Sequence, residues 1–313
     1  MLSYLVGRIA ATIPVMGVVA LFVFSLLYVA PGDPAAIIAG DQATPEDVER
    51  IRAGLGLDRP FLIRFGDWSW NIIQGDLGTS IFTNLPVTQL IAQRLEPTLS
   101  LMIITLVLAI LIAVPMGVVA AWKSSSWIDW TVMGFAVFGF SVPVFVVGYL
   151  LAYVFALELE WLPVQGYTPF SQGFWPWLEN LVLPAVALGG VYIALIARIT
   201  RATMLEVLQQ DYVRTARAKG VGRGGVLFIH ALKNAAVPIV TVIGIGIALL
   251  IGGAVVTESV FAIPGLGRLT VDAILRRDYP VIQGVVLLFS FVYVLVNLMI
   301  DVLYTLLDPR IRY

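Results

Sequence analysis

The chain has no cysteine and only one histidine, His230. Without cysteine it forms no disulfide, no thiolate metal site and no cysteine nucleophile, and its redox compartment stays undetermined. With a single histidine, a histidine-based metal site or a Ser-His-Asp triad is almost excluded. We therefore expect no metal site and no catalytic residues, and we expect His230 to have a structural or docking role.

Charged residues are also scarce. They make up 12% of the 313 residues, about half the share of roughly 25% that is usual in soluble domains. Hydrophobic residues reach 59% and the mean hydropathy is +0.94. The net charge of −1 provides no bulk attraction for nucleic acid. The composition predicts a protein that faces lipid and has no nucleic-acid partner.

Six long apolar runs predict transmembrane helices. A bilayer core of about 30 Å takes roughly 20 helical residues, because backbone groups in lipid must be satisfied within the helix. The sequence therefore predicts an all-α integral membrane protein with six transmembrane helices, at residues 9–30, 99–122, 131–157, 181–204, 235–257 and 281–307. The first run is longer than the 7–15-residue apolar core of a signal peptide, so we expect an uncleaved first helix.

The positive charges predict an orientation for these spans. Residues 198–234, which cover the end of the fourth span and the loop after it, carry seven Lys and Arg residues, whereas residues 158–180 between the third and fourth spans carry none. Short loops rich in Lys and Arg stay in the cytoplasm. We therefore expect the loop 205–234 and both termini to be cytoplasmic.

The polar segment 31–98 is predicted to lie outside. Thr44, Pro45 and Asp47 have the pattern of a helix start, and Gly54 of its end. Further on, aromatic and apolar residues around Trp68 predict a segment at the membrane interface, where tryptophan is enriched. The segment is interpreted as a cap over the outer mouth or as a docking surface for an external partner.

The loop 205–234 contains a predicted helix of about two turns, with Asp211 at its start and Lys219 at its end, as the helix dipole favours. Gly220 and Gly222 are predicted to end it. The loop is interpreted either as a topology anchor that meets anionic lipid or as a knob for a groove on a cytosolic partner. The stretch reads Asp211, Tyr212, Val213, Arg214, Thr215, Ala216, Arg217, Ala218, Lys219, Gly220, Val221 and Gly222.

Two further groups are candidates. Gly244, Ala248 and Gly252 recur every four residues on the fifth span, a spacing that lets helices approach closely. We interpret them as a packing seam within the chain or against a second membrane subunit. Polar residues inside spans are costly and often functional. A role in a substrate pathway is therefore open for three of them, Glu258, Asn297 and Asp301.

The loop resembles the characteristic cytoplasmic loop of ABC importer permeases, in the branch that handles dipeptides, oligopeptides, nickel, glutathione and related solutes. That loop usually opens Glu-Ala-Ala, where this chain has Arg214-Thr215-Ala216, a variant that is common in the peptide branch. The long first external segment resembles the first permease of a pair. Further motifs of the branch occur in order at residues 30–34, 55–60, 75–80, 257–261, 264–267 and 308–312.

The resemblance implies a multi-pass permease of the bacterial inner membrane, with residues 212–222 as a helix that couples to an ATPase. It implies four partners, namely a second homologous permease, two ATPase subunits and an extracytoplasmic solute-binding protein. The chain has no phosphate-binding loop of the G-x-x-x-x-G-K-[ST] type and no Gly-Lys pair. ATP and magnesium are therefore expected in the ATPase subunits, with no cofactor on this chain and no enzymatic activity of its own.

Two other functions remain open at this point. A self-contained secondary transporter or channel would have charge pairs or interrupted helices near the middle of the membrane, and the predicted spans are free of charge there. A polytopic membrane enzyme would need a cluster of catalytic residues, which the residue content disfavours. The transported solute is not predicted beyond a peptide or related small molecule.

Overall fold

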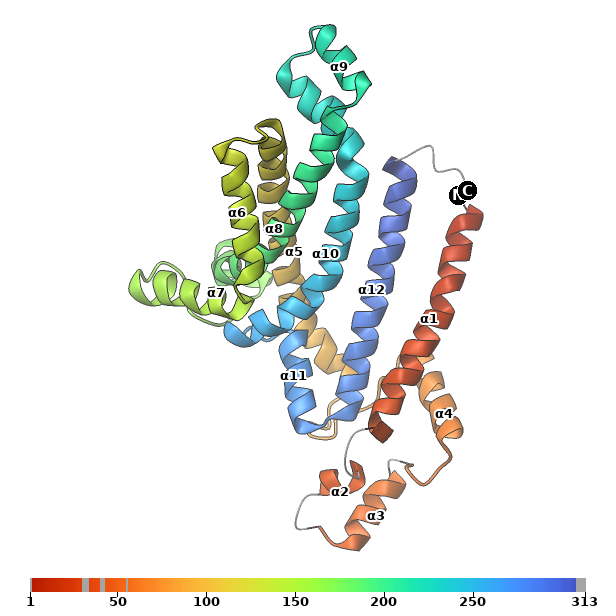
Figure 1. The fold of residues 1–313 in the computed structure, drawn as a ribbon. Helices are drawn as coiled ribbons and strands as arrows, with labels where there is room; N and C mark the ends of the chain where they lie inside the picture. Colours follow the sequence, from red (N-terminus) through yellow and green to blue (C-terminus); the bar gives the residue numbers. More distant parts are fainter. Residues whose placement is uncertain (1, 30–33, 40–42, 55, 308–313) are drawn as a thin grey trace. The chain divides into compact units, whose positions relative to one another are not determined.

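The computed structural model describes residues 2–29, 34–39, 43–54 and 56–307, and the regular secondary structure of these residues is helical, apart from one isolated bridge between Thr79 and Pro86 (Figure 1). The all-helical class predicted from the sequence is thus confirmed. The chain divides into two compact units. The first comprises Met1–Arg94 and Leu269–Val294, and the second comprises Leu95–Arg268 and Leu295–Tyr313.

Within the described residues, five helices are long and apolar enough to cross a membrane. They are α1 (Leu2–Val29), α5 (Val87–Trp122), α8 (Phe174–Leu208), α10 (Leu232–Val260) and α12 (Tyr279–Leu307). Five of the predicted spans fall on these helices, apart from residue 30, which lies outside the described residues. A sixth span results if a bent pair of helices is counted as one.

That bent pair occupies the third predicted span, 131–157. α6 (Trp127–Ser141) ends before Pro143, and α7 (Val144–Leu151) begins after it and continues into the π-helical turn η1 (Ala152–Glu158). The two helices meet at 102°. Val142 is extended, with φ −96° and ψ 123°, because the ring of a following proline disfavours the helical conformation. The sequence predicts one continuous span over 131–157, whereas the helix breaks at Pro143.

In the first unit, α3 (Pro45–Gly54) starts and ends where the sequence predicts. Thr44 and Asp47 form a reciprocal capping box, with the Asp47 N–H donating to Thr44 Oγ1 at 3.3 Å and the Thr44 N–H donating to Asp47 Oδ2 at 3.2 Å. The hydrogen bond from the Thr44 hydroxyl is the main reason that the pKa of Asp47 is lowered. α3 packs against α2 (Pro34–Ala39).

The helix α4 (Phe61–Ile73) packs one aromatic face against α1. Phe24 of α1 lies 5.3 Å from the ring of Phe61 and 5.1 Å from that of Trp68. The side chains of Trp70 and Ile73 remain 63% and 75% exposed. This two-faced helix matches the predicted interfacial segment, whose position in a membrane stays a prediction.

The motif at residues 75–80 forms a turn that holds a buried carboxylate of the same unit. Gly78 has φ +84°, and its N–H donates to Asp76 Oδ1 at 2.8 Å. Further along the turn, the Ser80 hydroxyl and the Ile81 N–H donate to the carboxylate of Asp278 at 2.5 and 3.2 Å. Asp278 is 4% exposed. The turn thus fixes the start of α12.

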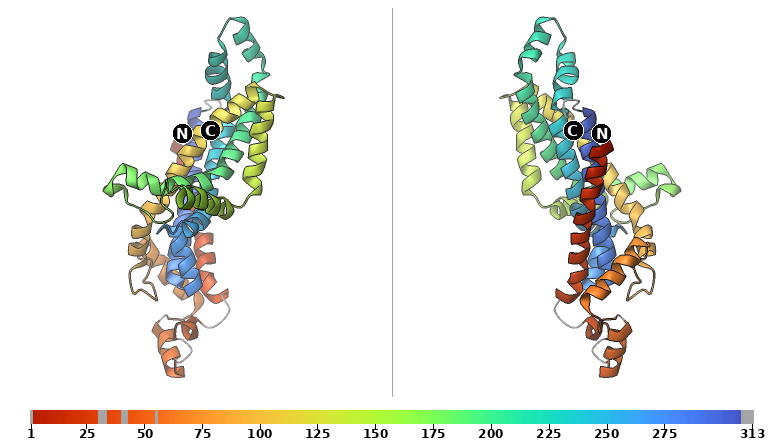
Figure 2. Two further views of the ribbon diagram at one scale, coloured as in Figure 1. Left: turned by 90° about the vertical axis from the view of Figure 1, so that its left-hand side faces the viewer. Right: turned by 90° about the vertical axis from the view of Figure 1, so that its right-hand side faces the viewer.

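The second unit is a helix bundle around α8, against which α6, α7 and α10 pack (Figures 1 and 2). Two thirds (67%) of the most apolar window of α8 is buried, against 28% for α5 and for α10, so α8 is the central helix. Gly117 of α5 lies so close to α8 that an added Cβ would be 2.7 Å from the carbonyl oxygen of Ala197. Such close approaches require glycine.

An ion pair joins the start of α6 to α8. The Arg201 guanidinium donates two hydrogen bonds to Asp129, one of them at 2.6 Å to Oδ2. The Asp129 carboxylate also accepts the Ser125 N–H at 3.0 Å, and the residue is 1% exposed. Arg201, counted in the sequence as a positive loop charge, therefore binds α6.

Candidate functional site

The candidate site is the short helix α9 (Asp211–Ala218), which lies beyond the ends of the long helices α8 and α10 of its unit (Figure 1). Its eight residues make about two turns, as predicted. Its end is a Schellman motif, in which the Gly220 N–H donates to the Arg217 carbonyl at 3.0 Å and the Val221 N–H donates to the Ala216 carbonyl at 3.2 Å. Gly220 has φ +78°, which favours glycine. The predicted end of the helix is confirmed.

α9 has one buried and one exposed face. Val213 is fully buried and Ala216 is 7% exposed, so the face at this i, i+3 spacing is turned toward its own unit. Arg214 and Arg217 are exposed, and Arg214 forms only a surface ion pair with Asp211 at 3.5 Å. Burial raises the pKa of the Tyr212 hydroxyl, so this side chain stays neutral. The outward face therefore presents a positively charged surface.

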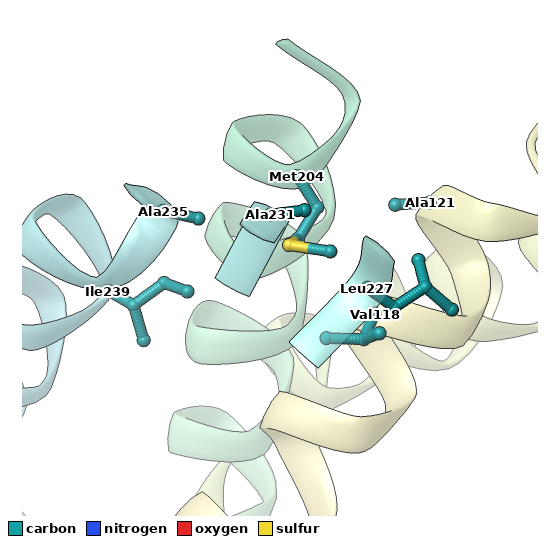
Figure 3. Close-up of a cluster of buried hydrophobic side chains, with 7 residues drawn as sticks. All are labelled: Val118, Ala121, Met204, Leu227, Ala231, Ala235 and Ile239. Carbon is teal, nitrogen blue, oxygen red and sulfur yellow. The ribbon is translucent and has the colours of Figure 1, made fainter. Parts of the chain in front are cut away.

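The chain continues from α9 into the π-helical turn η3 (Gly225–Ala231), which contacts α9 and leads directly into α10. Leu227 and Ala231 of η3 belong to a cluster of seven buried residues drawn in Figure 3, with Met204 of α8 in its middle. The other members come from the ends of α5 and α10: Val118, Ala121, Ala235 and Ile239.

This cluster, hereafter the junction cluster, links α9 to three long helices. Met204, Ala231 and Ala235 are fully buried. Protein interiors are close-packed and transmit displacement instead of absorbing it. The junction cluster therefore forms a close-packed connection from η3 to the ends of α5, α8 and α10. The sequence predicted the helix and its ends, but the apolar residues of the junction cluster could not be told from ordinary span residues.

Glu258, one of the three candidate pathway residues, is fully buried at the end of α10. Its carboxylate accepts the Thr98 hydroxyl at 2.6 Å and the Arg268 N–H at 3.0 Å. The Thr98 hydroxyl oxygen in turn accepts the Leu266 N–H at 2.8 Å. Glu258 thus joins α5 to the turn between α10 and α11 (Leu266–Arg276), and its oxygens are engaged by donors of this chain.

The glycines of the motif at 264–267 are required by that carboxylate. A Cβ added at Gly265 would lie 2.2 Å from Glu258 Cδ, and one at Gly267 would lie 2.9 Å from Glu258 Oε2 and 2.5 Å from the Cα of Val255. Only glycine lets the turn backbone approach so closely. The two motifs around residues 257–267, separate in the sequence, therefore form one buried structure.

The glycine stripe on α10 divides in the structure. An added Cβ at Gly244 would lie 2.0 Å from Ile300 Cδ1 of α12, whereas at Gly252 it would meet nothing within 4 Å. Ala248 between them is half-buried. Two other glycines, Gly246 and Gly253, face α8 instead. A Cβ at Gly253 would lie 2.7 Å from Leu188, and one at Gly246 would lie 3.5 Å from Tyr192. The structure thus brings Gly244, but not Gly252, against another helix of this unit.

We expect Gly244→Val to destabilise the protein by about 1–3 kcal/mol, because a larger side chain overpacks the contact with Ile300. Gly252→Val on the same helix is the matched control and should leave thermal stability of the purified chain unchanged. Thermal unfolding of both variants in one detergent measures the difference. Equal stability of the two variants would contradict the contact.

The remaining candidates lie on α12. Asn297 is exposed and Asp301 is half-buried, and both take part in interactions within the protein. Neither belongs to the α9 site or to the Glu258 site. The motif at 308–312 and residues 30–33 lie outside the described residues.

Comparison with known proteins covers nearly the whole chain. Residues 1–102 match the N-terminal family described as "Binding-prot-dependent transport system membrane comp, N-term", and residues 113–313 match "Binding-protein-dependent transport system inner membrane component". A probable peptide ABC transporter permease protein of Sinorhizobium fredii is 55% identical over 99% of both chains. A glutathione transport system permease protein of Escherichia coli is 44% identical, and a dipeptide transport system permease protein of Alkalihalophilus pseudofirmus is 41% identical, each over the full length of both chains.

Solved structures agree on the fold. An inward-facing structure of the methionine ABC transporter MetNI superposes with a TM-score of 0.60 at 17% identity, covering 70% of this chain and 97% of that chain. At this identity the likeness concerns the fold alone. A second crystal form of the same transporter gives a TM-score of 0.57.

Proposed function

The chain belongs to the family of binding-protein-dependent transport system inner membrane components, and we propose that it forms half of the membrane pathway of an ATP-driven importer and couples to the ATPase through α9. It is a multi-pass permease subunit of the inner membrane and a transport protein, as its relatives' names state. This membership argues against a secondary transporter or a membrane enzyme.

The observation that carries the coupling role is the form of α9. It is a separate two-turn helix with an exposed basic face, while its buried face and η3 join it to the junction cluster. A helix of this kind fits a groove on a partner. Closure of an ATPase dimer would press on α9 and shift the ends of α5, α8 and α10, which is an alternating-access mechanism driven from outside this chain.

Permeases of this family generally work with ATPase and solute-binding subunits. The finer assignment is part of the proposal: a second homologous permease, two cytoplasmic ATPase subunits that hold ATP and magnesium, and an extracytoplasmic solute-binding protein. The loop 205–234 and both termini would face the cytoplasm, as the distribution of positive charges favours. Gly252, exposed on α10 with open space around it, is a position where the second permease could pack.

The proposed solute is a peptide or a related small molecule. Relatives of 41–55% identity are named for transport of peptides, dipeptides and glutathione, and the structure describes no group of acidic residues or histidines that could hold a metal ion. Peptides and glutathione share amide groups and terminal charges. The proposal therefore covers small peptides as a class and names no single one.

Reversing the two positive charges at the end of α9 tests the coupling role. With Arg217→Glu and Lys219→Glu together, we expect the amount of ATPase that copurifies with the permease to fall at least tenfold, because a basic surface that meets a complementary partner becomes repulsive. The measurement is co-purification from membranes with expression matched, followed by solute uptake.

Lys233→Glu provides the control, since Lys233 is exposed but lies outside α9. It should leave ATPase association unchanged. If the double variant also keeps association and uptake, the loop serves only to anchor topology and the coupling role is wrong.

A further inference from the structure

A basic hollow lies beside α9, at the end of α5. It has a volume of about 680 Å³, within the range of roughly 300–1,000 Å³ that is usual for small-molecule sites. All its lining residues belong to the second unit: Trp122, Lys123, Arg217, Val221, Arg223, Val226 and Leu227.

The charge of this hollow has one sign. Lys123, Arg217 and Arg223 come from three separate segments, and none of the described lining residues carries a carboxylate. Two nearby acids in the sequence are already paired, Asp129 with Arg201 and Asp211 with Arg214. Three cations around one space repel one another unless an anion lies between them. The hollow therefore suits an anionic ligand.

Three exposed tryptophans lie at or near the hollow and indicate its level relative to the membrane. Trp127 and Trp130 at the start of α6 are 74% and 73% exposed, and Trp122 at the hollow is 45% exposed. The Lys123 ammonium lies 5.8 Å from the Trp122 ring, within cation–π range. Exposed tryptophans concentrate at the level of lipid headgroups. The exposed tryptophans therefore predict that the cations of the hollow lie at the level of the phosphate groups of the bilayer.

We propose that this hollow binds the phosphate headgroup of an anionic lipid and that the bound lipid holds α9 against the end of α5. The cations bind the phosphate oxygens, and the exposed side chains of Trp122 and Val221 provide apolar surface for the glycerol and the first acyl carbons. Basic pockets between helices at the cytoplasmic surface bind such headgroups. A free phosphate ion would use the cations but not the apolar wall.

The experiment uses the purified full-length chain in mild detergent and needs no ATPase, so its failure is distinct from failure of the proposed coupling role. Native mass spectrometry compares retention of phosphatidylglycerol with that of phosphatidylcholine of the same acyl chains. Each cation contributes about fivefold to binding, so Lys123→Gln with Arg223→Gln should weaken retention of phosphatidylglycerol about 30-fold. Retention of phosphatidylcholine should not change.

Two variants serve as controls. Lys233→Gln removes an exposed charge outside the hollow and should retain phosphatidylglycerol fully, and Lys123→Arg with Arg223→Lys should restore most of the binding. The three substituted side chains, Lys123, Arg223 and Lys233, are exposed, so we expect every variant to fold.

Three outcomes would overturn the proposal. In the first, phosphatidylglycerol is retained no better than phosphatidylcholine, or the Gln variants retain it unchanged. In the second, 10 mM inorganic phosphate displaces the lipid completely, which would make the site one for a soluble anion. In the third, the Gln variants keep the lipid but lose the ATPase during co-purification, which would assign the hollow to carboxylates of the ATPase.

Discussion

Glu258→Gln is expected to destabilise the protein by roughly 3–6 kcal/mol, although the change replaces only one oxygen. The carboxylate accepts hydrogen bonds from Thr98 and from the Arg268 N–H with both oxygens. A glutamine side chain has one acceptor oxygen, and its NH₂ group would take the place of the other carboxylate oxygen. Because Glu258 is fully buried, that NH₂ group would face a donor with no water to separate them. A charge-assisted hydrogen bond is lost and a donor is left unpaired, each costing about 1.5–3 kcal/mol.

Thermal unfolding of the purified chain measures this loss, and Glu179→Gln is the matched control because Glu179 is exposed. The control should unfold at the temperature of the unchanged protein. If Glu258→Gln keeps full stability but lowers solute uptake, Glu258 lines the pathway and does not hold the turn. Gly265→Ala should resemble Glu258→Gln, since its Cβ would enter the same carboxylate.

The sequence predicts the elements of this fold better than the links between them. Hydropathy located the apolar part of five long helices, because the length of an apolar run reflects the thickness of the bilayer. It did not locate the starts of α1, α5 and α8, which begin before the predicted spans. Local chemistry located α3 and α9, since the capping box at Thr44 and the Schellman motif at Gly220 depend on neighbouring residues alone. These features are local, and a single sequence carries them.

The bend at Pro143 is a feature that hydropathy and local motifs do not predict. Pro115, Pro184 and Pro238 lie inside continuous helices, whereas Pro143 ends one. In each case proline removes one hydrogen bond and crowds the preceding residue. Which of them breaks a helix depends on the packing of neighbouring helices, which a periodicity pattern does not contain.

The same limit applies to the candidate site. Glu258 was a candidate because buried charge is costly, but its partners Thr98 and Arg268 are 160 and 10 residues away in the chain. The basic hollow was likewise hidden, because Lys123 lies in a different loop from Arg217 and Arg223. The lipid interpretation of the basic loop and the docking interpretation were weighed as alternatives. The two proposals above give each interpretation a place, with Arg214 and Lys219 exposed for a partner and the adjacent hollow, which Arg217 also lines, suited to a lipid headgroup.

Met204→Ala is expected to have the largest effect on coupling. Met204 is fully buried in the middle of the junction cluster (Figure 3), so truncation leaves a cavity where α5, α8, η3 and α10 meet. Such truncations cost about 2–5 kcal/mol. A cavity also lets the neighbouring side chains move without moving the helices, because close packing is what transmits displacement. We therefore expect solute uptake per ATP hydrolysed to fall several-fold.

Reconstituted vesicles that contain the whole transporter allow both quantities to be measured together. Leu249→Ala is the control, since Leu249 lies on α10 but is 55% exposed, and it should leave the ratio of uptake to hydrolysis unchanged. The two variants distinguish the transmission of movement through the junction cluster from the binding of the ATPase to α9. Met204→Ala should keep the ATPase bound, because the outward face of α9 is intact, whereas charge reversal at Arg217 and Lys219 should release it. If Met204→Ala releases the ATPase as well, the cluster holds α9 in place for docking and has no separate part in transmission. If the ratio of uptake to hydrolysis is unchanged despite lowered stability, movement reaches the helices by another route.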